Sequence, residues 1–347
     1  MDNDKIGYLD NLRFVAICFV IVLHVSFPYV LNLKDGFNRN WIIGNFCDSA
    51  SRFCVPIFVM LTGALILPKK THLIEFLRKR FSRIVFPFIF WSLIYIVIQL
   101  ISLYLNYGIN IQLSKIVILN SFKNGSSYHF WYIYMLIGLY LFIPIIGSWI
   151  RNASKIEIHY FLIVWLFSSL LNSFDSYRFL PDINILYFSN YIGYLVLGYY
   201  LSQNTHSYDF KLIWSFILLL FCVCIIFLGT FYYSKSFSHF DGRFYDYLSL
   251  FVIIMSICVF IIFKELSKID CKSNYIFYSV RNFINKFNYG IYLAHVLILN
   301  IIERIGLNNY FETALIDIPL MSILCLFLSA VLVFIINKLP FGSYYSG

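Results

Sequence analysis

The chain has 347 residues, of which 61% are hydrophobic and 12% are charged, with a mean hydropathy of +0.78. A globular protein is roughly half apolar and a quarter charged, so a polar surface cannot cover this composition and a soluble globular protein is excluded. The formal net charge of +9 does not indicate nucleic-acid binding, because the positive residues gather in particular loops and form no continuous stripe. We predict an all-α, polytopic bundle of about ten transmembrane spans of roughly 20 residues each, in contact with membrane lipid.

Apolar runs with aromatic residues at their ends follow one another along the whole chain, with no Pro-, Gly- or Ser-rich linker between them. Aromatic ends of this kind are typical of helices that cross a membrane. The sequence therefore predicts a single integral-membrane domain over residues 1–347. The spans are expected near 12–32, 53–68, 84–106, 131–149, 158–172, 187–203, 212–233, 248–263, 288–306 and 317–337.

The loops between these spans predict the orientation of the chain. Most of its 26 positively charged residues fall on one side, above all in the basic stretches 69–83 and 264–286. Positive loops stay in the cytoplasm, so both termini are predicted to be cytoplasmic, in agreement with an even number of spans. The first apolar run is too long for a signal-peptide core and lacks a small-residue cleavage site, so we expect it to be retained as an anchor.

The first span contains RFVAICFVIVLH, in which ten residues lie between Arg13 and His24, a step of eleven. In a helix this step is a rotation of about 1100°, so the two residues lie on one face, about 16 Å apart along the axis. Ionisable residues in a span usually face the bundle interior or a watery cavity, which marks both as candidate site residues. The alternatives are that Arg13 snorkels to the interface and that His24 bonds a backbone carbonyl. Asp10, one turn earlier, is expected to orient Arg13; alternatively it caps the helix with Asn11.

Five stretches, in chain order, resemble signatures of the membrane-bound acyltransferase 3 family, whose mark is an arginine, ten residues and a histidine in the first transmembrane helix. They are YLDNLRFVAICFVIVLH (8–24), VPIFVMLTGALIL (55–67), RKRFSRIVFPFIFW (78–91), YHFWYIYMLIGLYLFIP (128–144) and YGIYLAHVLIL (289–299). The first carries that mark, and the third contains Arg80 and Arg83 as an R-x-x-R. Thr62 departs from the family pattern, which more usually has serine there.

The resemblance implies transfer of an acyl group, commonly acetyl, from cytoplasmic acyl-CoA to a hydroxyl of a glycan or glycolipid, at a bacterial inner membrane. Acetyl-CoA would then be a cosubstrate, and no metal is expected. CoA carries its thioester roughly 15–20 Å from its phosphates when extended, a reach comparable to the ~16 Å from Arg13 to His24. Arg80 and Arg83, with Arg78 close behind, are expected to bind the phosphates, unless their charge is only a topology signal. His24 would act as the general base, and an acyl-histidine intermediate stays open.

Three further candidate residues concern binding of the acceptor, which is a surface polysaccharide, such as lipopolysaccharide, or its lipid-linked precursor. His129 and Trp131, at the outer edge of the fourth span, could contact a sugar or could form an interfacial aromatic belt. His295 is either a substrate-binding residue or a packed histidine. The competing functions are O-succinyl transfer and the export of a polysaccharide or small molecule without chemistry. The Arg13/His24 pair, together with the basic cytoplasmic residues, favours an enzyme over an exporter, because an exporter has no need for a CoA-phosphate site.

Overall fold

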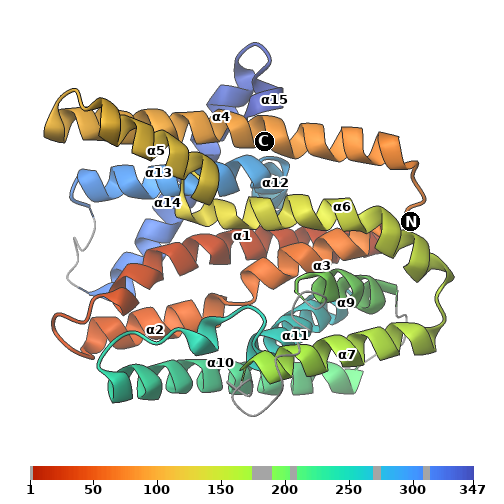
Figure 1. The fold of residues 1–347 in the computed structure, drawn as a ribbon. Coiled ribbons are helices and arrows are strands. Elements are labelled where there is room, and N and C mark those ends of the chain that lie inside the picture. The colour runs from red at the N-terminus through yellow and green to blue at the C-terminus, as the bar shows by residue number, and fades with distance from the viewer. Residues whose placement is uncertain (1–2, 174–189, 204–208, 269–274, 308–312) are drawn as a thin grey trace. The chain divides into compact units, whose positions relative to one another are not determined.

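The structure is a computed structural model that describes residues 3–173, 190–203, 209–268, 275–307 and 313–347. Every regular element in these ranges is a helix, which confirms the predicted all-α class for the described part of the chain (Figure 1). By length and composition, 7 candidate membrane spans occur there: Gly7–Leu31, Arg39–Ile66, Leu73–Tyr107, Ile111–Asn152, Leu212–Phe237, Arg243–Leu266 and Ala314–Lys338. The count of ten spans and the cytoplasmic termini stay predictions.

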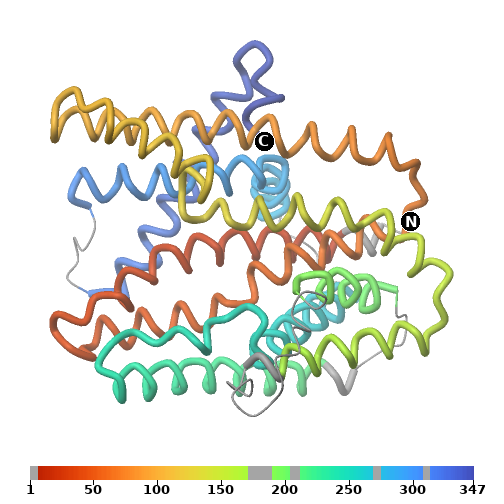
Figure 2. The backbone as a smooth tube through the Cα atoms, in the orientation of Figure 1, coloured from red at the N-terminus to blue at the C-terminus, as the bar shows by residue number. Residues whose placement is uncertain are grey.

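The elements, labelled as in Figure 1, include α-helices that range from 4 residues in α15 to 35 in α4, and the path of the chain through the elements can be followed in Figure 2. They are α1 (Asn3–Leu31), α2 (Arg39–Ser51), α3 (Cys54–Ile66), α4 (Leu73–Tyr107), α5 (Ile111–Asn124), η1 (Tyr128–Phe130), α6 (Trp131–Asn152), α7 (Lys155–Ser173), α9 (Ile192–Gln203), α10 (Asp209–Phe237), η3 (Arg243–Tyr245), α11 (Leu250–Leu266), α12 (Tyr275–Lys286), α13 (Asn288–Arg304), α14 (Ala314–Lys338) and α15 (Gly342–Tyr345).

These helices form two compact units. The first unit comprises Met1–Lys70, Ile145–Asn285 and Asn309–Ser322, and the second comprises Thr71–Pro144, Lys286–Asn308 and Ile323–Gly347. Arg78, Arg80 and Arg83 therefore belong to a different unit from Arg13 and His24, whereas Lys69 and Lys70 belong to the same one. The single domain over residues 1–347 stays a prediction.

In the first unit, α1 packs against α2, α3 and α11, and α3 packs closely on α9. Glycines permit the α3–α9 contact: a Cβ at Gly63 would lie 2.0 Å from the carbonyl oxygen of Leu195, and one at Gly198 would lie 2.0 Å from that of Met60. Backbones approach this closely only where small residues meet, as is common between membrane helices. The crossing of α3 and α9 is therefore fixed by the two glycines.

Several helices lie where no span was predicted from the sequence, and two of them show the reason. One is α2, whose buried residues include the polar Asn45, Asp48 and Ser49. Spans were predicted from apolar runs, and these polar side chains interrupt the run. The helix was therefore not predicted, although the fold buries it. The other is α5, which mixes apolar residues with Lys115 and Lys123 and is largely exposed.

In the second unit, α4 is the central element and packs against α5, α13 and α15. Its 35 residues extend about 52 Å at 1.5 Å per residue, well beyond a hydrocarbon core of roughly 30 Å, so its basic first turns can lie outside the core. The hydroxyl of Tyr95 ties α4 to α13, because it donates to Leu293 O (3.0 Å) and accepts from Leu297 N (2.9 Å). Trp91 Nε1 donates to Ser346 O (3.4 Å) and so links α4 to the chain just after α15.

Candidate functional site

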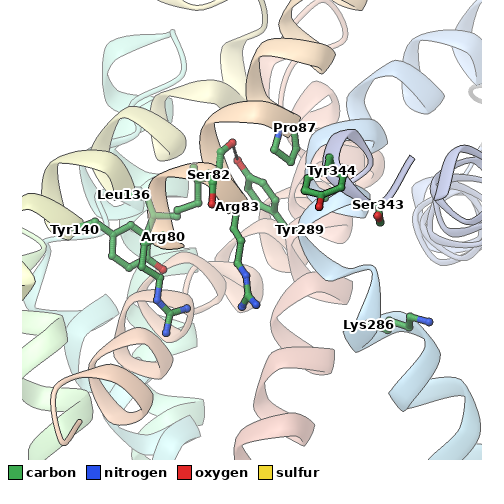
Figure 3. Close-up of a pocket in the computed structure, with 12 residues that line it drawn as sticks. Arg80, Ser82, Arg83, Pro87, Leu136, Tyr140, Lys286, Tyr289, Ser343 and Tyr344 are labelled. Atoms are coloured by element: carbon green, nitrogen blue, oxygen red, sulfur yellow. Dashed lines mark hydrogen bonds between the residues drawn. The ribbon is translucent and has the colours of Figure 1, made fainter. Parts of the chain in front are cut away.

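The second unit contains a cavity of about 610 Å³, drawn in Figure 3. Five helices and one residue beside them contribute to its wall, and all of the lining residues belong to this unit. They are Arg80, Ser82, Arg83, Ile84 and Pro87 from α4, Leu136 and Tyr140 from α6, Lys286 at the end of α12, Tyr289 from α13, and Ser343, Tyr344 and Gly347 in and beside α15.

One stripe of α4 forms the basic side of the cavity. Arg80, Arg83, Ile84 and Pro87 follow one another at helical spacings of three, four and seven residues, which places them on a single face. Figure 3 shows the guanidinium groups of Arg80 and Arg83 extending from α4 in the same direction. The stripe therefore presents two planar cationic groups to one space.

Lys286 brings a third positive charge to the same lining, and no Asp or Glu side chain is among the lining residues. Like charges one turn apart on a helix destabilise it by a few tenths of a kcal/mol, about 0.2–0.5. A bound anion would offset this repulsion, because arginine grips carboxylate and phosphate oxygens with a planar fork and lysine supplies a point charge. The cavity is therefore suited to a polyanionic group such as a phosphate.

Hydroxyls and aromatic rings complete the lining. Tyr289 donates from its hydroxyl to Ile84 O (3.0 Å), which fixes its ring between α13 and α4. Tyr140 and Tyr344 add two further rings, and Ser82 and Ser343 add hydroxyls. The lining thus combines cations for an anion with rings that can lie against a flat base or ring.

The structure separates the three arginines that the sequence grouped together. Arg80 is half-buried and Arg83 is exposed, and both line the cavity, whereas Arg78 is exposed and is not among the lining residues. The reason is helical phase: two residues rotate by about 200°, so Arg78 and Arg80 point to opposite sides of α4. Lys286, which the sequence analysis counted only as a topology signal, takes the third cationic position.

Asp10 and Arg13 form an ion pair in the first unit, with Arg13 Nη1 2.9 Å from Asp10 Oδ1. Because α1 begins at Asn3, Asp10 lies inside the helix and does not cap it. Asn11 instead accepts a hydrogen bond from Arg281 Nη1 (2.7 Å). The ion pair places the Asp10 carboxylate beside Arg13. The orienting role of Asp10 stays a prediction.

His24 lies on the same helix as Arg13, since α1 continues without a break to Leu31. The predicted shared face, with about 16 Å between the two residues along the axis, follows from this continuity. The His24 side chain is half-buried. The role of His24 as the base stays a prediction.

His129 and His295 meet in the second unit, although 165 residues separate them in the sequence. Their ring centroids are 4.9 Å apart, and both side chains are buried. Tyr95 packs against His129 at 5.8 Å, and the Tyr292 hydroxyl donates to His129 O. Trp131 is 38% exposed, so it differs from the two histidines in its surroundings.

The hydrogen bonds define the tautomer of His295. Its Nδ1 lies 2.6 Å from the carbonyl oxygen of Tyr292, which can only accept. Nδ1 therefore carries the hydrogen, and in the neutral ring the lone pair is on Nε2. On His129, Nδ1 lies 3.0 Å from Ser127 Oγ, a contact that either tautomer allows.

A buried ion pair that was not predicted from the sequence joins Asp48 of α2 to Arg52, the residue just after this helix. The Arg52 guanidinium lies 3.8 Å from the centroid of the Tyr245 ring. An acid and a base four residues apart could have indicated this ion pair on a helix. It was not predicted, because the expected span began only at residue 53. Within the described ranges, no group of three or more His, Cys, Asp and Glu side chains is placed to hold a metal ion.

The helices and the cavity define a class, a multi-pass helical membrane protein with a cationic cavity. The family follows from a comparison with known proteins: residues 6–338 match the family model described as Acyltransferase domain, Acyl_transf_3. The chain belongs to this family and is a membrane acyltransferase, as the sequence signatures indicated. No curated protein and no solved structure matches it.

Proposed function

We propose that this acyltransferase moves an acetyl group from cytoplasmic acetyl-CoA to a hydroxyl of a cell-surface polysaccharide or of its lipid-linked precursor, in a bacterial inner membrane. The family supplies the reaction class. The observation that carries the choice of donor is the cavity with Arg80, Arg83 and Lys286 and no acidic lining residue.

The chemistry of CoA fits these groups. Its phosphates would accept charge-assisted hydrogen bonds from the two guanidinium groups and from the Lys286 ammonium. Its adenine ring would lie against a tyrosine ring of the lining, since stacking of a base on an aromatic side chain contributes about 1–3 kcal/mol. An exporter of glycans has no use for such a site.

His24 is the proposed general base. The acceptor oxygen attacks the thioester carbonyl while its proton passes to the neutral imidazole; the C–O bond forms, the C–S bond breaks, and the imidazolium returns a proton to the departing thiolate. Asp10 holds Arg13 through their ion pair. An acyl-histidine intermediate is the alternative route for the same residues.

We propose His129, Trp131 and His295 as the residues that bind the acceptor. From Arg83 to Tyr95, which packs against His129, there are twelve residues of α4, or about 18 Å along the helix axis. This distance is comparable to the extended length of the pantetheine arm, roughly 15–20 Å. It supports an acceptor site near His129, where the thioester of a CoA bound through its phosphates would lie. The exposed Trp131 ring offers a face for a sugar.

The experiment is to record NMR spectra of surface glycan from cells with and without the gene, and to assay purified protein in nanodiscs with acetyl-CoA and with succinyl-CoA. Glycan that reaches the surface but lacks one O-acetyl group, together with thiol release from acetyl-CoA, supports the proposal. Loss of a succinyl group would change the donor. Loss of the glycan itself from the surface would instead indicate export, and unchanged glycan would refute the proposal.

A further inference from the structure

Helix α12 (Tyr275–Lys286) exposes a stripe of apolar side chains, whereas a helix of a water-soluble protein buries such a stripe. Ile276, Val280 and Phe283 follow at spacings of four and three residues and so form one stripe. Their exposed fractions are 68%, 48% and 39%. On the other side of the helix, Arg281 is only 8% exposed. The apolar stripe faces outward, and a charged residue faces inward.

The polar side of α12 is held against α1, within the first unit. Arg281 Nη1 donates to Asn11 Oδ1 (2.7 Å), and Asn285 Nδ2 donates to Asp10 O (2.8 Å). The Arg281 guanidinium also lies 4.8 Å from the centroid of the Tyr278 ring. Turning the apolar stripe inward would break these bonds and expel a buried guanidinium, so the outward stripe is a fixed feature of the fold.

Length and charge indicate what covers the stripe. Apolar surface in water is unfavourable by about 25 cal/mol per Å², so in a membrane protein the lipid is the favourable environment for it. Twelve residues extend only about 18 Å, too short to cross a core of roughly 30 Å. The helix contains no Asp or Glu, so no acidic side chain of its own repels the headgroups of anionic lipid.

We propose that α12 is an interfacial helix, which lies at the boundary of headgroups and acyl chains with Ile276, Val280 and Phe283 in contact with lipid. Because Arg281 and Asn285 hold Asn11 and Asp10, the same helix fixes the level of the Asp10–Arg13 pair at the membrane surface. The identity of the acyl donor and acceptor does not enter this argument.

The test is nitroxide accessibility in bilayers that contain anionic lipid. Single spin labels are attached through Ile276→Cys, Val280→Cys and Phe283→Cys in a background without native cysteines that retains acyl transfer. Two reference sites bracket them: Lys34→Cys, in an exposed loop, and Ile217→Cys, on the exposed side of α10.

We expect collisions with oxygen to be several-fold more frequent at the stripe than at Lys34→Cys, and collisions with a water-soluble nickel chelate to be several-fold rarer. The depth derived from the two should be shallower than at Ile217→Cys. Nickel accessibility equal to that of Lys34→Cys would place the stripe in water and overturn the proposal. Low accessibility to both reagents would overturn it too, because protein would then cover the stripe, from this chain or a second copy.

Discussion

Arg80 and Arg83 should contribute unequally to the binding of CoA. Losing one charge-assisted hydrogen bond costs about 1.5–3 kcal/mol. Coulomb interactions are weaker in water than in a partly buried site. The loss should therefore be near the upper end of this range for the half-buried Arg80 and near the lower end for the exposed Arg83. For Arg83→Gln we expect about a tenfold rise in the Kd for CoA, and for Arg80→Gln roughly a hundredfold rise. Calorimetry on purified protein in nanodiscs measures both.

Arg78→Gln is the matched control, because it removes the same charge from the same helix at a residue outside the cavity lining. Its Kd should stay within about twofold of wild type, a change of only ~0.4 kcal/mol. Arg80→Lys should recover part of the loss, since lysine keeps the charge but not the planar fork. If Arg78→Gln weakens binding as much as Arg80→Gln, or if no arginine variant changes the Kd, the phosphate site is elsewhere and the basic residues are only a topology signal.

Three further predictions follow from the fold and the site. His24→Ala should abolish acyl transfer and keep CoA binding, by the same calorimetry; near-normal glycan acylation would exclude the base. A cysteine at Ser82 should react with an impermeant maleimide only in opened membranes, and one at Asn110 in intact spheroplasts, because about 40 Å of helix and turn separates them; the reverse pattern would invert the topology. Gly198→Ala should lower stability in thermal unfolding by at least ~3 kcal/mol, since its Cβ would meet Met60 O at 2.0 Å; Gly138→Ala, with no atom within 4 Å, should not.

The sequence predicts much of the fold because the solvent is a membrane. In lipid, every backbone group must bond internally, so long apolar runs can only be helices, and hydropathy alone identifies most of them. The helix α1 is the clearest case, since a pattern of eleven residues placed Arg13 and His24 on one face. Helices with many polar residues cannot be predicted from hydropathy. In the buried pair of Asp48 and Arg52 the guanidinium packs on the ring of Tyr245, almost 200 residues away, and hydropathy carries no information on such a contact.

The same holds for the candidate site: its local geometry can be predicted from the sequence, whereas its contacts between distant helices cannot. Helical phase, which the sequence contains, already separates Arg78 from Arg80 and aligns Arg80 with Arg83. Lys286 is different: it lies in that cavity beside Tyr289, three residues later, whose hydroxyl donates to the Ile84 carbonyl on α4. The contact of His129 with His295 likewise depends on the bonds between Tyr95 and α13, which no spacing in the sequence encodes. A motif can therefore name the chemical groups of a site, whereas the contacts between distant helices determine which of these groups act on one ligand.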